Sequence, residues 1–147
     1  MQTDLDKRYQ TLVILWFGLL MSVGMYLLIS LVAGPAIDEQ PGSAPNTLLF
    51  VTLAIVGLSL VGLSFLVKHN LLERSVERQD MGLVQKSLIV ACAMCEVTAV
   101  LGLLGRFLMG SRYYYVLFIF SALGIALHFP RRIQLQAANY RNQEQLS

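Results

Sequence analysis

Charged residues are scarce in this sequence, and their scarcity excludes most soluble proteins. Only 14% of the 147 residues are Asp, Glu, Lys or Arg, and 56% are hydrophobic. A typical soluble domain has about a quarter of its residues charged. The mean hydropathy of +0.62 points the same way. Because so few charges cannot cover a water-soluble surface, we expect a single membrane domain that comprises residues 1–147.

Motifs for enzymatic chemistry are also lacking. The sequence contains no phosphate-binding glycine loop, no nucleophile triad and no nucleic-acid-binding motif. Cys92 and Cys95 form one C-x-x-C, which is a weak redox or metal signal without a second cysteine pair. We interpret both cysteines as small buried hydrophobic residues. We expect no metal, no other cofactor, no nucleic-acid partner and no enzymatic activity.

Long apolar stretches are what the sequence does contain. A helix needs about 20 residues to cross a hydrocarbon core of about 30 Å. The stretches are continuous runs of Leu, Val, Ile and Phe without the alternation of barrel strands, so they should be helices. The sequence predicts an all-α integral membrane protein with four transmembrane helices in an antiparallel bundle. The predicted spans are residues 12–33, 47–67, 87–105 and 113–129.

The segments that connect these spans differ in character. Residues 34–46 contain three prolines and an acidic pair, which is typical of an irregular loop. Residues 68–86 mix charged residues with a helical apolar pattern, which allows a helical extension at the membrane surface. Residues 106–112 predict a tight turn that makes a hairpin of the last two spans. The tail, residues 130–147, is expected to be poorly ordered.

The distribution of Lys and Arg predicts the orientation of the chain. With a cytoplasmic N-terminus, nine of the eleven Lys and Arg residues lie inside, and only Arg106 and Arg112 lie outside. The loop of residues 68–86 is then cytoplasmic. The first span could also be a cleavable signal peptide, but its apolar run exceeds the about 7 to 15 residues typical of one. We therefore expect a multi-pass protein of the cytoplasmic (inner) membrane with both termini in the cytoplasm.

Glu96 is the one Asp, Glu, Lys or Arg residue within the predicted spans. It is the tenth of nineteen residues in its span, which places it near the bilayer midplane. A charge at that depth costs about 2.5 to 3.5 kcal/mol, so the carboxyl must be protonated, paired, or directed toward protein or water. Because a low-dielectric environment disfavours the ionised form, Glu96 is a candidate proton- or cation-binding residue. The structural alternative is a protonated Glu96 that only joins two helices.

Small residues flank Glu96 on its own helix. Cys92, Ala93 and Ala99 share its face, and small residues allow a second helix to approach closely. Hydrogen-bonding side chains at a similar depth occur in the other three spans, whereas a basic residue does not. The candidate partners of Glu96 are Ser22, Ser59, Ser121 and Tyr26.

Three further polar residues are expected near the membrane interfaces. His128 lies at the inner end of the fourth predicted span, and His69 lies in the basic loop, where we expect it to be solvated. Arg106 follows Glu96 by ten residues, about 15 Å of helical rise, and therefore belongs to the outer interface. None of the three is expected to be the partner of Glu96.

Residues 78–103 resemble the carboxylate-bearing helix of the proteolipid c subunit of rotary ATP synthases and ATPases. That family has an Arg-Gln pair in its cytoplasmic loop, followed by a helix with the pattern A-x-x-E-x-x-x-x-x-G-L. The corresponding residues here are Arg78 and Gln79, then Ala93, Glu96, Gly102 and Leu103. The resemblance implies that Glu96 binds and releases a proton, and that Arg78 and Gln79 contact a soluble partner. It is partial, and Asp80 stands where the family has proline.

These observations favour a small proton- or cation-handling subunit or carrier that uses Glu96. The alternative is a structural subunit or assembly partner of a larger membrane complex, with no transport role of its own. A small multidrug-type exporter is a third class, but such exporters carry their carboxyl in the first helix, where this sequence has none. The expected partners are the lipid bilayer and either a second copy of the chain or another membrane protein.

Overall fold

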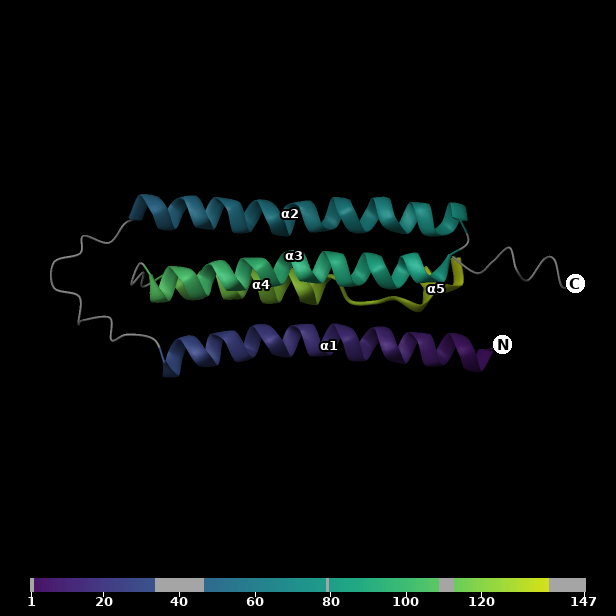
Figure 1. The fold of residues 1–147 in the computed structure, drawn as a ribbon. Coiled ribbons are helices and arrows are strands. Elements are labelled where there is room, and N and C mark those ends of the chain that lie inside the picture. Colours follow the sequence, from purple (N-terminus) through teal and green to yellow (C-terminus); the bar gives the residue numbers. More distant parts are fainter. Residues whose placement is uncertain (1, 34–46, 79, 109–112, 138–147) are drawn as a thin grey trace, which may run out of the picture.

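The computed structural model confirms the all-α prediction. It describes residues 2–33, 47–78, 80–108 and 113–137, and every regular element within these ranges is a helix. Four helices lie side by side, and a short fifth helix lies near the start of the first (Figure 1). The helices are α1 (Gln2–Val32), α2 (Thr47–Arg78), α3 (Met81–Phe107), α4 (Tyr114–Leu127) and α5 (Arg132–Ala137).

Three of these helices are long and apolar enough to cross a membrane, and they support a membrane protein. Their apolar parts are Leu5–Val32, Leu48–Arg78 and Gly82–Phe107. With 14 residues, α4 rises about 21 Å, which is less than the about 30 Å of a hydrocarbon core. It ends early because Pro130 lacks an N–H group and disfavours a helical residue before it. The fourth predicted span is therefore a shorter helix than expected.

The long helices continue past their apolar stretches. α1 starts well before the predicted first span, and α2 runs without a break to Arg78. Most of the predicted loop, residues 68–86, is thus helical, and its first part continues the axis of α2 instead of lying along a surface (Figure 1). Asp80 then starts α3, because its Oδ1 accepts a hydrogen bond of 2.8 Å from the Gly82 backbone N–H.

Replacement of Asp80 by alanine should weaken the start of α3. The variant loses the side-chain cap, and we expect the free energy of unfolding to fall by about 1 kcal/mol. Asp80→Ser keeps an oxygen that can accept the same hydrogen bond, so its stability should stay close to that of the native chain. Thermal unfolding in detergent, followed by circular dichroism, measures both changes. Equal losses in the two variants would show that capping is not the cause.

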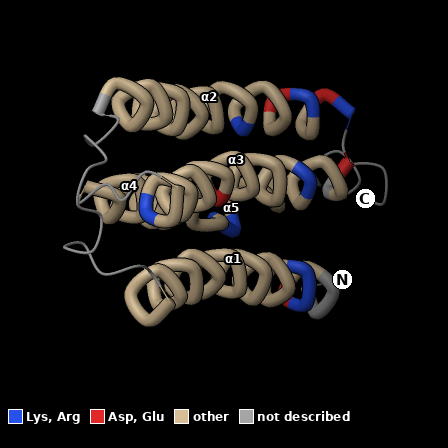
Figure 2. Tube along the Cα trace, turned by 60° about the vertical axis from the view of Figure 1, so that its left-hand side comes forward, with Lys and Arg blue, Asp and Glu red and all other residues tan. Residues whose placement is uncertain are grey.

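α3 is the central helix of the structure. It contacts α1, α2 and α4, and α1 and α2 lie on its opposite sides (Figures 1 and 2). Gly102 permits the close approach of α4, because a Cβ atom there would lie 3.1 Å from Leu117 Cβ and 3.2 Å from the Tyr114 carbonyl oxygen. Thr98 Oγ1 donates a hydrogen bond of 3.0 Å to the Gly57 carbonyl of α2. The turn between α3 and α4, residues 109–112, lies outside the described residues.

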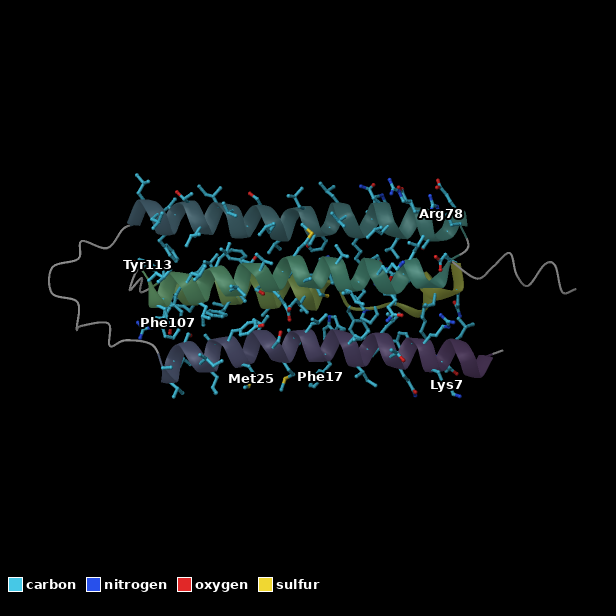
Figure 3. All side chains as sticks on the ribbon, in the orientation of Figure 1. Lys7, Phe17, Met25, Arg78, Phe107 and Tyr113 are labelled. Atoms are coloured by element: carbon cyan, nitrogen blue, oxygen red, sulfur yellow. The ribbon has the colours of Figure 1, made fainter. Side chains whose placement is uncertain are left out.

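Most charged residues gather at one end of the helices. Figure 2 shows them at the start of α1, the end of α2 and the start of α3. Lys7 and Arg78 mark this end, whereas Phe107 and Tyr113 mark the other (Figure 3). On the outer face of α1, Phe17 and Met25 point away from α3 (Figure 3) and are 53% and 57% exposed. Apolar side chains exposed in this way suit contact with lipid.

The segment after α4 is more ordered than the sequence predicts. Leu135 of α5 is buried in the same core cluster as Leu12 and Val84. Arg132 forms an ion pair of 3.5 Å with Asp6. Its guanidinium also lies 4.9 Å from the centre of the Tyr9 ring. The expectation of a poorly ordered tail is therefore wrong for residues 132–137, whereas residues 34–46 and 138–147 lie outside the described residues.

Candidate proton site

Glu96 lies midway along α3, on the side that contacts α1. Its side chain is half-buried, and Oε1 forms a hydrogen bond with the hydroxyl of Ser22. Ser22 Oγ also donates a hydrogen bond of 2.7 Å to the Leu19 carbonyl, one turn earlier on α1. The structure therefore brings together the predicted carboxyl and one of its four candidate partners.

The other three candidate partners have different contacts. Ser59 is exposed on α2 and donates to the Ile55 carbonyl at 2.8 Å. Ser121 is buried, but it donates to the backbone carbonyl of Cys95 at 2.7 Å. Tyr26 is half-buried against the core cluster, and among the described residues it forms no hydrogen bond with Glu96. Depth along a span therefore identified Ser22 as a partner of Glu96, but it did not exclude three residues that have other contacts.

Ser22, which lies between Glu96 and the Leu19 carbonyl, can form a hydrogen bond with either protonation state of the Glu96 carboxyl. A hydroxyl group has one proton to donate and can accept hydrogen bonds as well. When Glu96 is ionised, Ser22 donates its proton to the carboxylate. When Glu96 is protonated, the acid donates to Ser22 Oγ, and Ser22 donates to the Leu19 carbonyl. The same heavy-atom positions thus satisfy both forms of the carboxyl.

The small residues on α3 face protein, as predicted. Ala91, Cys92, Cys95 and Ala99 have no exposed surface. Both cysteines are free thiols, which confirms the interpretation of buried small residues. Ala93 differs from the prediction, because it is exposed. The reason is the position of α4 and α2, which cover the Cys95 side of α3 and leave Ala93 uncovered.

A second polar cluster joins α2, α3 and the end of α4. His128, which lies directly after α4, is fully buried by protein. Its ring lies 3.4 Å from Ser64 Oγ, which also lies 3.6 Å from Cys95 Sγ. Lys68 reaches into the same region and donates to the His128 carbonyl at 3.2 Å. The four-residue spacing of Ser64 and Lys68 puts them on one face of α2, which is the sequence signal that could have indicated this cluster.

Arg106 lies in the last turn of α3 but is not solvated. Only 6% of its surface is exposed. Its guanidinium carbon lies 5.2 Å from the centre of the Tyr114 ring. Within the described part of the chain, Nε and Nη1 have no hydrogen-bond partner. The sequence predicted that Arg106 lies near the end of its helix, but not that its guanidinium is buried.

The remaining predicted site residues lie at the charged end. Arg78 is exposed at the last position of α2, whereas Gln79 lies outside the described residues. His69 is solvated as predicted, and its Nε2 lies 3.2 Å from Glu73 Oε1. In the ranges that the structure describes, no group of three or more His, Cys, Asp or Glu residues is placed to hold a metal ion.

Comparison with known proteins gives no independent information about the site. No protein-family model, no curated protein and no solved structure matches this chain. The resemblance of residues 78–103 to the proteolipid c subunit therefore rests on the sequence pattern alone. The function has to be argued from Glu96 and its surroundings.

Proposed function

We propose that this protein is a small proton- or cation-handling subunit or carrier of a membrane, in which Glu96 binds and releases the proton. It has no enzymatic activity under this proposal. The observation that supports it is the hydrogen bond between Glu96 and Ser22 at the contact of α1 and α3. Because Ser22 can donate to a carboxylate or accept from an acid, both protonation states are accommodated without movement of the helices. This property suits a residue that exchanges protons.

The proposal includes a topology of four antiparallel transmembrane helices with both ends in the cytoplasm, in a cytoplasmic (inner) membrane. The concentration of charges around Lys7 and Arg78 supports a cytoplasmic location of that end (Figures 2 and 3). α4 supplies about 21 Å of the fourth crossing. The segment from His128 to Arg131, before α5, would complete it. A proteolipid-like role would place Arg78 and Gln79 at the contact with a soluble partner.

Replacement of Glu96 by glutamine should abolish proton handling and leave the fold intact. Glutamine keeps the size and the hydrogen bonding of the side chain but cannot titrate. In proteoliposomes with an internal pH-sensitive dye, we expect proton flux driven by a potassium diffusion potential to fall to the level of empty vesicles. Infrared spectra of the reconstituted protein should lose a pH-dependent carboxylic-acid C=O band in the same variant.

Glu77→Gln is the matched control for this experiment. It makes the same chemical change at an exposed acid near the end of α2, so flux and the infrared band should resemble those of the native chain. Native flux and an unchanged band in Glu96→Gln would contradict the proposal. Ser22→Ala should retain the infrared band but shift its pH dependence, because it removes the hydrogen-bond partner of the carboxyl.

The second candidate function is a structural subunit or assembly partner. The hydrogen bond between Ser22 and Glu96 also links α1 to α3, so it favours this role as well. Under this alternative glutamine is tolerated at position 96, whereas leucine, which cannot form the hydrogen bond, releases the protein from its complex. Affinity purification from native membranes distinguishes the two roles: a fixed set of other proteins supports the subunit, and recovery as a homo-oligomer supports the carrier.

A further inference from the structure

His128 is a buried titratable side chain that lies beside a different face of α3 from that of Glu96. The His128 ring is fully buried where α2, α3 and α4 meet. It lies 4.4 Å, centre to centre, from the ring of Phe65. Glu96 contacts α1, whereas the preceding residue, Cys95, approaches Ser64 of α2. Glu96 and His128 therefore lie beside different faces of α3.

The backbone fixes the proton on one ring nitrogen of His128. Nδ1 lies 2.6 Å from the Gly124 carbonyl oxygen. A carbonyl oxygen only accepts hydrogen bonds, so Nδ1 carries a proton in every charge state. The proton that can come and go is therefore on Nε2, which lies 3.4 Å from Ser64 Oγ.

Ser64 can pair with Nε2 whether or not it is protonated. Ser64 Oγ lies 2.6 Å from the Val61 carbonyl, one turn earlier on α2. When His128 is neutral, the hydroxyl donates to the lone pair of Nε2. When His128 is an imidazolium, Nε2–H donates to Ser64 Oγ, and the hydroxyl turns to the Val61 carbonyl. Ser22 is placed in the same way between Glu96 and the Leu19 carbonyl.

Three buried serines differ from Ser22 and Ser64. Ser30, Ser75 and Ser87 also donate to a carbonyl one turn earlier, at 2.7 to 2.8 Å. Among the described contacts, none of the three reaches a titratable side chain. The position of Ser64 and Ser22 beside His128 and Glu96 is thus not a general property of serines in these helices.

The charges around His128 come from a few identifiable groups. α2 contributes Lys68, whose ammonium donates to the His128 carbonyl at 3.2 Å. α3 contributes the thiols of Cys95 and Cys92, and Arg131 is close enough to act electrostatically on Lys68. From α1, Trp16 approaches through Phe129, with their ring centres 5.0 Å apart, and carries no charge. Lys68 is therefore the cation whose repulsion most directly disfavours a positive charge on His128.

We propose that His128 is a second proton-binding residue of the protein, with Ser64 as the hydroxyl that adapts to its two charge states. It takes a proton at Nε2 inside the helix assembly, beside a different face of α3 from that of Glu96. The site does not depend on a transport role for Glu96. It adds a proton-binding group to whatever function the protein performs.

The sequence contains only two histidines, which makes the site directly observable. His69 is exposed and pairs with Glu73, so His69→Gln leaves His128 as the only imidazole. In this variant, labelled with ¹⁵N-histidine and reconstituted in lipid nanodiscs, nuclear magnetic resonance reports the tautomer and the charge across pH. We expect the neutral form with a proton on Nδ1 at high pH and conversion to imidazolium as the pH is lowered.

Two outcomes would overturn the proposal. One is a His128 ring that stays neutral down to the lowest pH at which circular dichroism and Trp16 fluorescence report a folded protein. The other is a neutral form with its proton on Nε2, which contradicts the geometry at Gly124. Trp16 is a suitable reporter because it is the single tryptophan and its Nε1 donates to the Ile125 carbonyl at 2.7 Å.

Substitutions around the ring test the role of Ser64. Ser64→Ala leaves the Nε2–H of the imidazolium without a partner, so the midpoint should move to lower pH by about one unit. Ser59→Ala, on the same helix but exposed, should leave the midpoint unchanged. Lys68→Met removes the opposing cation and should move the midpoint to higher pH. Equal midpoints in the Ser64→Ala and Ser59→Ala variants would show that Ser64 has no part in the site.

The proposal for His128 can fail independently of the proposal for Glu96. The titration is repeated in a chain that also carries Glu96→Gln. An intact His128 titration there, together with native proton flux, would reject the role of Glu96 and keep that of His128. A His128 that never titrates, together with flux lost on Glu96→Gln, would give the opposite result.

Discussion

Replacement of Gly124 by leucine is expected to destabilise the protein by about 2 to 3 kcal/mol. A Cβ atom at this position would lie 2.8 Å from Cys95 Sγ and 3.2 Å from Val61 Cγ1. Both neighbours belong to packed helices, and the Cys95 side chain is fully buried. The leucine can therefore be accommodated only if α4 moves away from α2 and α3. Such a movement would also displace the carbonyl that holds His128.

The measurement is unfolding in mixed micelles by increasing sodium dodecyl sulfate, followed by circular dichroism and Trp16 fluorescence. Gly62→Leu is the matched control, because a Cβ atom at Gly62 of α2 meets nothing within 4 Å. We expect its stability to be unchanged or slightly higher, since leucine favours helix more than glycine does. If Gly124→Leu unfolds at the same concentration as Gly62→Leu, the close packing of α4 against Cys95 is wrong.

Replacement of Arg106 by methionine is expected to stabilise the protein by about 1 to 3 kcal/mol. Desolvation of a guanidinium is costly, and hydrogen bonds normally compensate for it. Here Nε and Nη1 have no such bonds among the described residues, and the Tyr114 ring offers an attraction of about 0.5 to 2 kcal/mol. Methionine fills a similar space without a charge, so removal of the cation should be favourable.

Arg74→Met provides the comparison, because Arg74 is exposed on α2 and its removal should change stability little. Both variants are measured by the same detergent unfolding. A loss of stability in Arg106→Met would mean that an anion outside the described residues, such as a lipid phosphate, binds the guanidinium. Repetition in micelles without anionic lipid would then identify the phosphate, because the loss would disappear there.

The sequence alone was sufficient to predict the approximate positions of the four longer helices, but not α5. Apolar runs mark the lipid-facing parts of α1, α2 and α3. The true ends lie further out, because a helix continues through charged turns such as Glu73–Arg78 for as long as nothing interrupts its backbone hydrogen bonds. Pro130 acts in the opposite sense, and its effect on α4 was underestimated because hydropathy does not report backbone constraints.

The candidate site could be predicted only in part. Depth along a span, which the sequence does provide, placed Glu96 and Ser22 at the same level. The face of each helix that meets its neighbour is set by packing, so Ser59 and Tyr26 could not be separated from Ser22 in advance. His128 was missed for a related reason. Its position near a span end suggested exposure, whereas Ser64, Lys68 and Phe65 of another helix cover it.

The contacts of α3 with the helices around it restrict rotation of α3 about its axis. Glu96 and Cys95 are consecutive residues on this helix, and they contact Ser22 of α1 and Ser64 of α2 respectively. Any rotation of α3 about its axis that carries Glu96 away from Ser22 must also displace Cys95 relative to Ser64. The contact between Cys95 and Ser64 therefore resists such a rotation and helps to keep Glu96 beside Ser22.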